Sequence, residues 1–186
     1  MSIAQQTRRA ALALAALTAF SAPAWADKVH LVTSMGDIVI ELDAAKAPKS
    51  VDNFLQYVKS GHYDGTVFHR VIDNFMIQGG GMTADLKQKP TRPPISLESK
   101  NGLNNVRGSV AMSRTSDPNS ATAQFFISVK DNAFLDAANS RDGQGYAVFG
   151  TVVSGMDVVD KIKAVPTGPG DVPVQPVTIK TATLEN

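Results

Sequence analysis

The sequence predicts a mainly β protein in which eight short antiparallel strands close into a barrel and two α-helices cap its open ends. Short runs rich in β-branched and aromatic residues recur between turn-forming residues along the chain. Only two segments carry the apolar spacing of an amphipathic helix. The strand-like runs do not alternate with helical ones, which disfavours a parallel βαβ sheet and favours antiparallel closure that removes the sheet edges.

The first 26 residues have the pattern of a cleavable export signal. A basic start precedes an apolar stretch over residues 10–20, and Ala24 and Ala26 fit an Ala-x-Ala cleavage site. The alternative is a membrane anchor, but that would need about 20 apolar residues. We expect cleavage after Ala26, export to the periplasm by a route that the sequence does not specify, and one domain over residues 27–186.

Composition excludes several classes of function. Loss of the signal would remove two arginines and change the formal net charge from +1 to −1, so we expect no nucleic-acid partner. The chain has no cysteine, which excludes disulfides and thiolate chemistry. The three histidines lack metal-ligand spacing, and no second apolar segment approaches membrane length. We therefore expect no metal, no cofactor and no membrane contact after cleavage.

The first half of the domain is predicted to contain four strands. Residues 28–43 alternate apolar and polar around a turn at residues 35–37, as in a hairpin. Two further strands are expected at residues 66–72 and 75–80. A long connection of low hydrophobicity then runs over residues 79–108 with one short strand-like stretch, and connections of that length are uncommon unless they are functional.

Two helices are predicted from apolar residues that recur at helical spacing. The first covers residues 48–61, where Ser50 is expected to cap the start and Gly61 to end the helix. The second covers residues 154–165. The apolar positions are Val51, Phe54, Leu55 and Val58 in the first helix and Met156, Val159 and Ile162 in the second.

The second half of the domain supplies the remaining strands. They are expected at residues 108–114, 123–129, 146–153 and 177–184, with a Pro/Gly-rich loop over residues 166–176. Alternation along a strand places Gln124 and Phe126 on one face and Phe125 on the other, and it likewise places Met76 and Gln78 together.

Arg70 stands in a mostly apolar run just before Met76 and Gln78. If the polar faces of these strands coincide, they form a shallow apolar patch rimmed by an arginine and two glutamines, which is typical of a peptide-binding site. From the residues alone, a solvated surface arginine is the alternative.

Four motifs follow one another along the chain: "FHRVIDNFMIQGG", "AMSRTSDPNSATAQFFISV", "NAFLD" and "YAVFGTVVSGMDVVDKI". In this order they resemble the cyclophilins, the peptidyl-prolyl cis-trans isomerases, and among them the exported bacterial branch. The resemblance covers nearly all of the chain after the signal and implies an eight-stranded barrel with two helices. It implies isomerisation of X-Pro bonds in unfolded or partly folded exported proteins, with proline-containing polypeptides as partners. The alternative is a proline-binding chaperone or holdase that uses the same patch without catalysis.

The resemblance also implies the site residues. Arg70 matches the catalytic arginine, and Gln78 supports it or the substrate carbonyl. The proline pocket matches Phe75, Met76, Phe126, Phe134 and Leu135, the second family glutamine matches Gln124, and the strand that pairs with the substrate matches Ser113, Arg114 and Thr115.

Three positions depart from the best-known eukaryotic pattern. Phe134 replaces a tryptophan, Tyr146 a histidine and Arg114 an asparagine. Since phenylalanine lacks the indole N–H with which the family holds cyclosporin, we expect weak cyclosporin binding. We expect Arg114 to place a long cation at the rim of the site, where it biases the substrate sequence.

Overall fold

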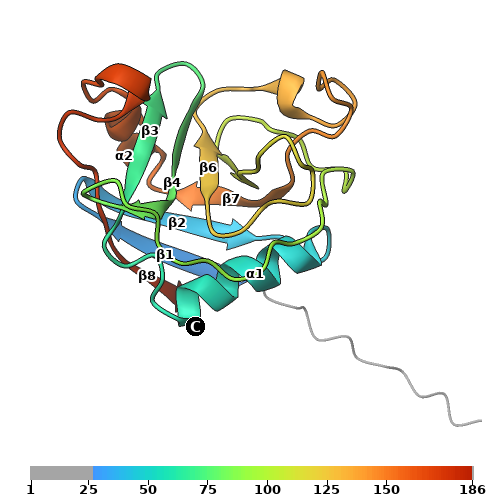
Figure 1. The fold of residues 1–186 in the computed structure, drawn as a ribbon, viewed down its shortest axis with the longest axis horizontal. Helices are drawn as coiled ribbons and strands as arrows, with labels where there is room; N and C mark the ends of the chain where they lie inside the picture. Colours follow the sequence, from blue (N-terminus) through green and yellow to red (C-terminus); the bar gives the residue numbers. More distant parts are fainter. Residues whose placement is uncertain (1–26, 186) are drawn as a thin grey trace, which may run out of the picture.

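The computed structural model describes residues 27–185, so the expected signal peptide lies outside the described residues. One antiparallel sheet has the strand order β3-β4-β6-β5-β7-β2-β1-β8 (Figure 1). The strands are β1 (Lys28–Thr33), β2 (Gly36–Leu42), β3 (Thr66–Ile72), β4 (Met76–Thr83), β5 (Ser109–Met112), β6 (Phe125–Ser128), β7 (Val148–Ser154) and β8 (Ile179–Glu185). The helices are α1 (Pro48–Lys59) and α2 (Met156–Lys163), with short 3-10 turns η1 (Ala133–Leu135) and η2 (Pro169–Asp171).

The sheet curls until its two edge strands meet. Val67 on β3 pairs with Thr178, just before β8, in an isolated antiparallel bridge. The Phe68 N–H donates to the Val177 carbonyl at 2.9 Å, and the Gly65 N–H donates to the Ile179 carbonyl at 2.8 Å. The predicted mainly β fold with eight antiparallel strands and two helices is confirmed. Neither helix within residues 27–185 is long and apolar enough to cross a bilayer.

Helix α1 closes one side of the curled sheet with its predicted apolar stripe. Phe54 is fully buried and its ring centroid lies 5.0 Å from that of Phe149 and 5.5 Å from that of Phe125. The rest of the stripe is also buried. Helix α2 buries Val159 and Ile162 as predicted, so both predicted helices pack through the faces that their sequence spacing indicated.

The cap predicted at Ser50 is wrong, because α1 begins two residues earlier at Pro48. Proline suits the first helical position, where no N–H is needed and its φ is already helical. The free N–H groups of Lys49 and Ser50 instead donate to the carboxylate of Glu98, at 3.0 and 2.8 Å. The predicted end is confirmed: Gly61 follows the helix with φ +66°, a conformation that glycine adopts readily.

Several predicted strand boundaries differ from the structure by a few residues. The hairpin turn lies at residues 34–35, because the Met35 N–H donates to Thr33 Oγ1 at 3.0 Å. Strand β4 continues to Thr83, because Met82 and Thr83 pair with Val67 and Thr66 of β3. Strand β5 ends at Met112, two residues before the predicted end.

Candidate functional site

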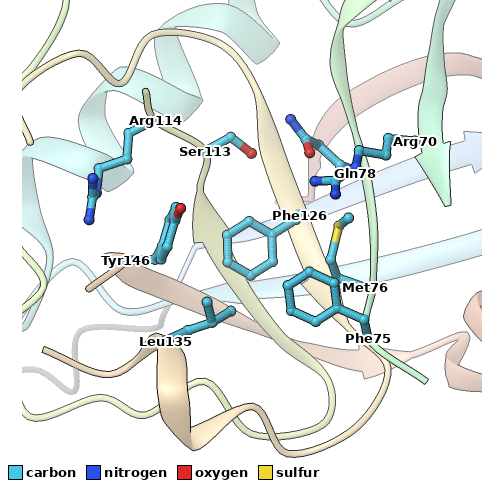
Figure 2. A pocket seen from close by; sticks show the side chains of 9 residues that line it. All are labelled: Arg70, Phe75, Met76, Gln78, Ser113, Arg114, Phe126, Leu135 and Tyr146. Carbon is cyan, nitrogen blue, oxygen red and sulfur yellow. The ribbon is translucent and has the colours of Figure 1, made fainter. Parts of the chain in front are cut away.

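A cavity of about 180 Å³ opens beside four neighbouring strands, β3, β4, β6 and β5 (Figure 2). Strand alternation explains which side chains reach it, since Phe125 belongs to the main core while Phe126 belongs to a second apolar cluster with Met76, Ala111 and Leu135. Nine residues line the cavity: Arg70, Phe75, Met76, Gln78, Ser113, Arg114, Phe126, Leu135 and Tyr146. All nine were predicted as site residues.

The floor of the cavity is apolar and rigid. Phe126 and Met76 are 4% and 2% exposed, and they come from adjacent paired strands. The Tyr146 ring meets the Phe126 ring edge-on with their centroids 5.6 Å apart. The carbonyl of Phe75 accepts hydrogen bonds from the Val129 N–H and from Asn132 Nδ2, which fixes the end of the cavity next to η1.

Arg70 and Gln78 form one side of the cavity, as Figure 2 shows. They face each other as paired residues of β3 and β4. The Arg70 side chain is 44% exposed, and its one ion pair within residues 27–185, with Asp171 of η2, is long at 3.5 Å. Most of its guanidinium donors therefore remain available at the rim.

Gln124 does not line the cavity, but it accepts a hydrogen bond from Gln78, which does. Gln78 Nε2 donates to Gln124 Oε1 at 2.9 Å, which orients the Gln78 amide. Gly81 is required for this arrangement, because a Cβ there would lie 2.4 Å from Gln124 Cγ. The glycine run inside β4, residues 79–81, was the one sequence signal of this close approach, but the sequence does not say which strand lies beside it.

Arg114 lines the cavity as predicted, but its side chain does not stand out at the rim as a long exposed cation. Its side chain is 3% exposed, and its guanidinium carbon lies 4.6 Å from the centroid of the Tyr146 ring. Nε donates to the Gly145 carbonyl at 2.9 Å, Nη1 to the Thr115 carbonyl at 2.9 Å, and Nη2 to Asp142. These partners lie up to 31 residues away in sequence, so no local pattern revealed them.

Thr115 and Phe134 lie outside the cavity lining. The Thr115 N–H donates to Ser120 Oγ at 2.9 Å, so it is not free to pair with a substrate strand, and residues 113–115 are not part of β5. Phe134 is 56% exposed and stacks on Phe75 with ring centroids 5.6 Å apart. It lines an adjoining hollow of about 460 Å³ that shares Leu135 and Tyr146 with the cavity.

The ionisable groups of the cavity lining are two arginines and a tyrosine, with no histidine or carboxylate. The neighbouring His69 points elsewhere: it is buried, and burial lowers the pKa of its imidazole below the usual value. Within residues 27–185 there is no cluster of three residues suited to hold a metal ion. The cavity is therefore arranged to bind and polarise a ligand rather than to exchange protons with it.

Comparison with known proteins agrees with this geometry. Residues 28–184 match the family described as cyclophilin type peptidyl-prolyl cis-trans isomerase. A peptidyl-prolyl cis-trans isomerase of Streptomyces antibioticus is 62% identical over 84% of this chain and 97% of its own length. Peptidyl-prolyl cis-trans isomerase A of Dickeya dadantii is 53% identical over 94% of this chain and 95% of its own length.

A solved cyclophilin-type isomerase from Cryptosporidium parvum is similar in structure. It superposes with a TM-score of 0.74 at 25% identity, over 87% of this chain and 99% of that one. A second structure, described as that isomerase in the presence of the dipeptide Ala-Pro, superposes with a TM-score of 0.73 at 26% identity, over 86% of this chain and 99% of that one. The fold and the cavity define a cyclophilin-like protein, and the chain belongs to the cyclophilin-type peptidyl-prolyl cis-trans isomerases. It is an enzyme that acts on proline-containing peptides.

Proposed function

We propose that this isomerase accelerates rotation about X-Pro bonds in unfolded or partly folded exported proteins, with Arg70 as an electrostatic catalyst above an apolar proline pocket. One observation carries the proposal: a half-exposed guanidinium with few protein partners lies at the rim of a small apolar cavity. The Ala-Pro dipeptide named with the Cryptosporidium structure supports a proline-containing ligand for this fold.

The chemistry needs no bond to break. The X-Pro bond resists rotation by about 18–20 kcal/mol because its C–N bond has partial double-bond character. In the twisted state this resonance is lost and the prolyl nitrogen regains a lone pair. Any group that stabilises the twisted state more than the planar state therefore lowers the barrier.

Arg70 can supply this stabilisation by donating to the prolyl nitrogen or to the carbonyl oxygen as it swings. The guanidinium is charged at every physiological pH, so no proton transfer is needed. The apolar floor adds to the effect, because the planar amide is the more polar form and loses more when it leaves water. Each 1.36 kcal/mol of preferential stabilisation gives about a tenfold acceleration.

The other residues of the cavity have supporting roles in this proposal. Phe75, Met76, Phe126 and Leu135 hold the proline ring, and Gln78, oriented by Gln124, supports Arg70 or the substrate carbonyl. Phe134 borders the hollow that adjoins the ring site, where a cyclosporin side chain would find an aromatic face without an N–H donor. Weak cyclosporin binding is part of the proposal.

Export to the periplasm is proposed from residues 1–26, whose basic start, apolar stretch and small residues fit a cleavable signal. Amino-terminal sequencing of the protein recovered from periplasmic extracts tests this part. A start at Asp27 supports the proposal, whereas an uncut chain in the cytoplasmic fraction contradicts it.

Exchange NMR tests the mechanism. Cis/trans exchange of an Ala-Pro-Phe peptide is measured with the protein of residues 27–186 and with its Arg70→Ala variant. We expect fast exchange with the unaltered protein and a collapse of exchange, with peptide binding retained, in the variant. Binding without exchange in both proteins would favour the holdase alternative, and unchanged exchange in the variant would contradict the role of Arg70.

A further inference from the structure

The Ser113 hydroxyl is an unused polar group inside the cavity. Its Oγ is fully buried and has no hydrogen-bond partner among residues 27–185, although Ser113 lines the cavity. Figure 2 shows the Ser113 oxygen near Phe126 and Gln78, on the side of the site that also carries Tyr146. A buried hydroxyl usually has a partner, so an unpaired one that faces a ligand site indicates that the ligand supplies it.

The backbone fixes the direction in which the Ser113 side chain leaves the chain. Ser113 follows the last residue of β5, and alternation gives it the same face as Ala111, which lies in the apolar cluster under the cavity. The Ser113 N–H donates to the Gln124 carbonyl at 2.9 Å. On the other side, the three hydrogen bonds of Arg114 hold the following residue. The Ser113 side chain is therefore directed to the cavity face before a ligand arrives.

Other unpaired hydroxyls of the protein provide a comparison. Ser109 begins β5, the strand that ends just before Ser113, and its buried Oγ also has no partner in the part of the chain that the structure describes. Ser109 does not line the cavity. Since the Oγ atoms of both serines are buried and have no partner among residues 27–185, the cavity is what distinguishes Ser113 from Ser109.

We propose that Ser113 Oγ donates a hydrogen bond to a main-chain carbonyl of the bound X-Pro segment, which makes Ser113 a catalytic residue of this isomerase. The inference rests on the proposed use of this cavity as the substrate site. A segment around proline offers mainly acceptors, because proline has no N–H while every residue keeps its carbonyl. Arg70 lies on β3 and Ser113 beyond β5, so the two donors hold the segment from separate strands across the apolar floor.

Matched variants test the proposal by isomerase kinetics on a proline peptide. We expect Ser113→Ala to lower kcat/KM by about three- to tenfold, the range for one hydrogen bond to a neutral group. Ser113→Thr, which keeps the hydroxyl, restores most of the loss. Ser109→Ala, which removes an equivalent hydroxyl outside the cavity, changes kcat/KM by less than about twofold.

Thioxo peptides identify the acceptor. One peptide carries sulfur on the carbonyl before proline and a second carries it on the carbonyl of proline, because sulfur is a weaker acceptor. At the carbonyl that Ser113 contacts, the loss caused by Ser113→Ala shrinks; at the other carbonyl, the loss is unchanged. A loss that is equal in both thioxo peptides and in the parent peptide would overturn the proposed contact.

The outcomes separate this inference from the proposed function. If Arg70→Ala abolishes exchange while Ser113→Ala matches Ser109→Ala, the inference about Ser113 fails and the proposed function stands. If the unaltered protein gives no exchange, the proposed function itself fails. Thermal unfolding of each variant is measured alongside, and a Ser113→Ala loss matched by Ser109→Ala at equal destabilisation would also overturn the inference.

Discussion

The two sides of the cavity each carry an arginine, and the two arginines differ in almost every physical respect. On the β3 and β4 side, Arg70 is 44% exposed and, among the described residues, forms one long ion pair of 3.5 Å with Asp171. On the side formed by the segment after β5 and the loop before β7, Arg114 is 3% exposed and donates three hydrogen bonds. Its guanidinium also lies against the Tyr146 ring.

This difference shows that residue type alone does not define a catalytic cation. A guanidinium whose donors are already bound to the protein has little to offer a substrate, whereas one with few partners at a rim can respond to developing charge. Arg114 instead joins the loop that carries Asp142 and Gly145 to the cavity wall. Gly145 itself has φ +63°, and a Cβ there would lie 2.5 Å from the Ala137 nitrogen, which shows how tightly this loop is folded.

The largest effect is expected at Arg70. Arg70→Ala should lower kcat/KM by about 100- to 1000-fold, as for removal of a single preorganised donor in other enzymes. Its free energy of unfolding should change by less than about 0.5 kcal/mol, because the side chain is half-exposed and weakly paired.

Arg70→Lys is the matched variant, since it keeps the charge but loses the planar set of donors; we expect it to recover only part of the activity. Exchange NMR and urea unfolding on the same samples provide both quantities. A lysine variant with full activity would show that charge alone is sufficient at this side of the cavity.

At Arg114 we expect the reverse of Arg70: a large effect on stability and a small effect on activity. Arg114→Ala should lower the free energy of unfolding by about 2 kcal/mol, because it leaves the Gly145 and Thr115 carbonyls without their donor. The Asp142 ion pair contributes little to this loss of stability, since that carboxylate is 46% exposed. Activity should fall by less than about tenfold and mainly through KM, as expected for a loosened binding wall.

Urea unfolding and steady-state kinetics on Arg114→Ala and Arg70→Ala together test the comparison. A loss of kcat at Arg114 equal to that at Arg70, with stability unchanged, would mean that the buried arginine also acts on the substrate.

A smaller effect is expected at Phe134, which lines the hollow that adjoins the cavity. Phe134→Trp adds an indole N–H to an exposed ring that already stacks on Phe75, so stability should barely change. Cyclosporin inhibition should strengthen by about two- to tenfold, the value of one added hydrogen bond. Inhibition constants for the two proteins provide the measurement, and tight inhibition of the unaltered protein would contradict the expectation.

Lowering the pH should reduce the free energy of unfolding through His69 and through Asp142 in two different pH ranges. Burial lowers the pKa of His69 next to Arg70, so the unfolded chain binds more protons than the folded one, and stability falls as pH drops below about 6.5. The backbone N–H of Gln144 and the Arg114 guanidinium hold the pKa of Asp142 well below its usual value. The stability that Asp142 contributes is therefore present above about pH 4 and is lost only as pH falls further.

Free energies of unfolding measured between pH 7 and pH 5 test whether His69, and not Asp142, lowers stability in this range. We expect a decrease over this range that becomes smaller in His69→Gln, while Asp142→Asn keeps the same slope. A curve that is flat from pH 7 to pH 5, or a slope that Asp142→Asn removes, would contradict the assignment.

Much of the fold could be predicted because its signals are local. The spacing of Phe54 and Val58 identified the buried face of α1, and the glycine that ends this helix was also identified. The cap at Ser50 was mispredicted, because the real partner of the helix start is Glu98. A carboxylate 48 residues away leaves no trace in the local pattern.

In the candidate site, too, some features could be predicted from the local sequence and others depended on distant residues. Alternation alone placed Met76 with Gln78, and Phe126 apart from Phe125, because successive side chains of a strand must point to opposite faces. The different environments of Arg70 and Arg114 were decided by tertiary structure, since two of the three hydrogen-bond partners of Arg114 come from a loop 28 to 31 residues away. Backbone geometry fixes which face a side chain occupies, whereas its partners depend on how the closed sheet brings distant segments together.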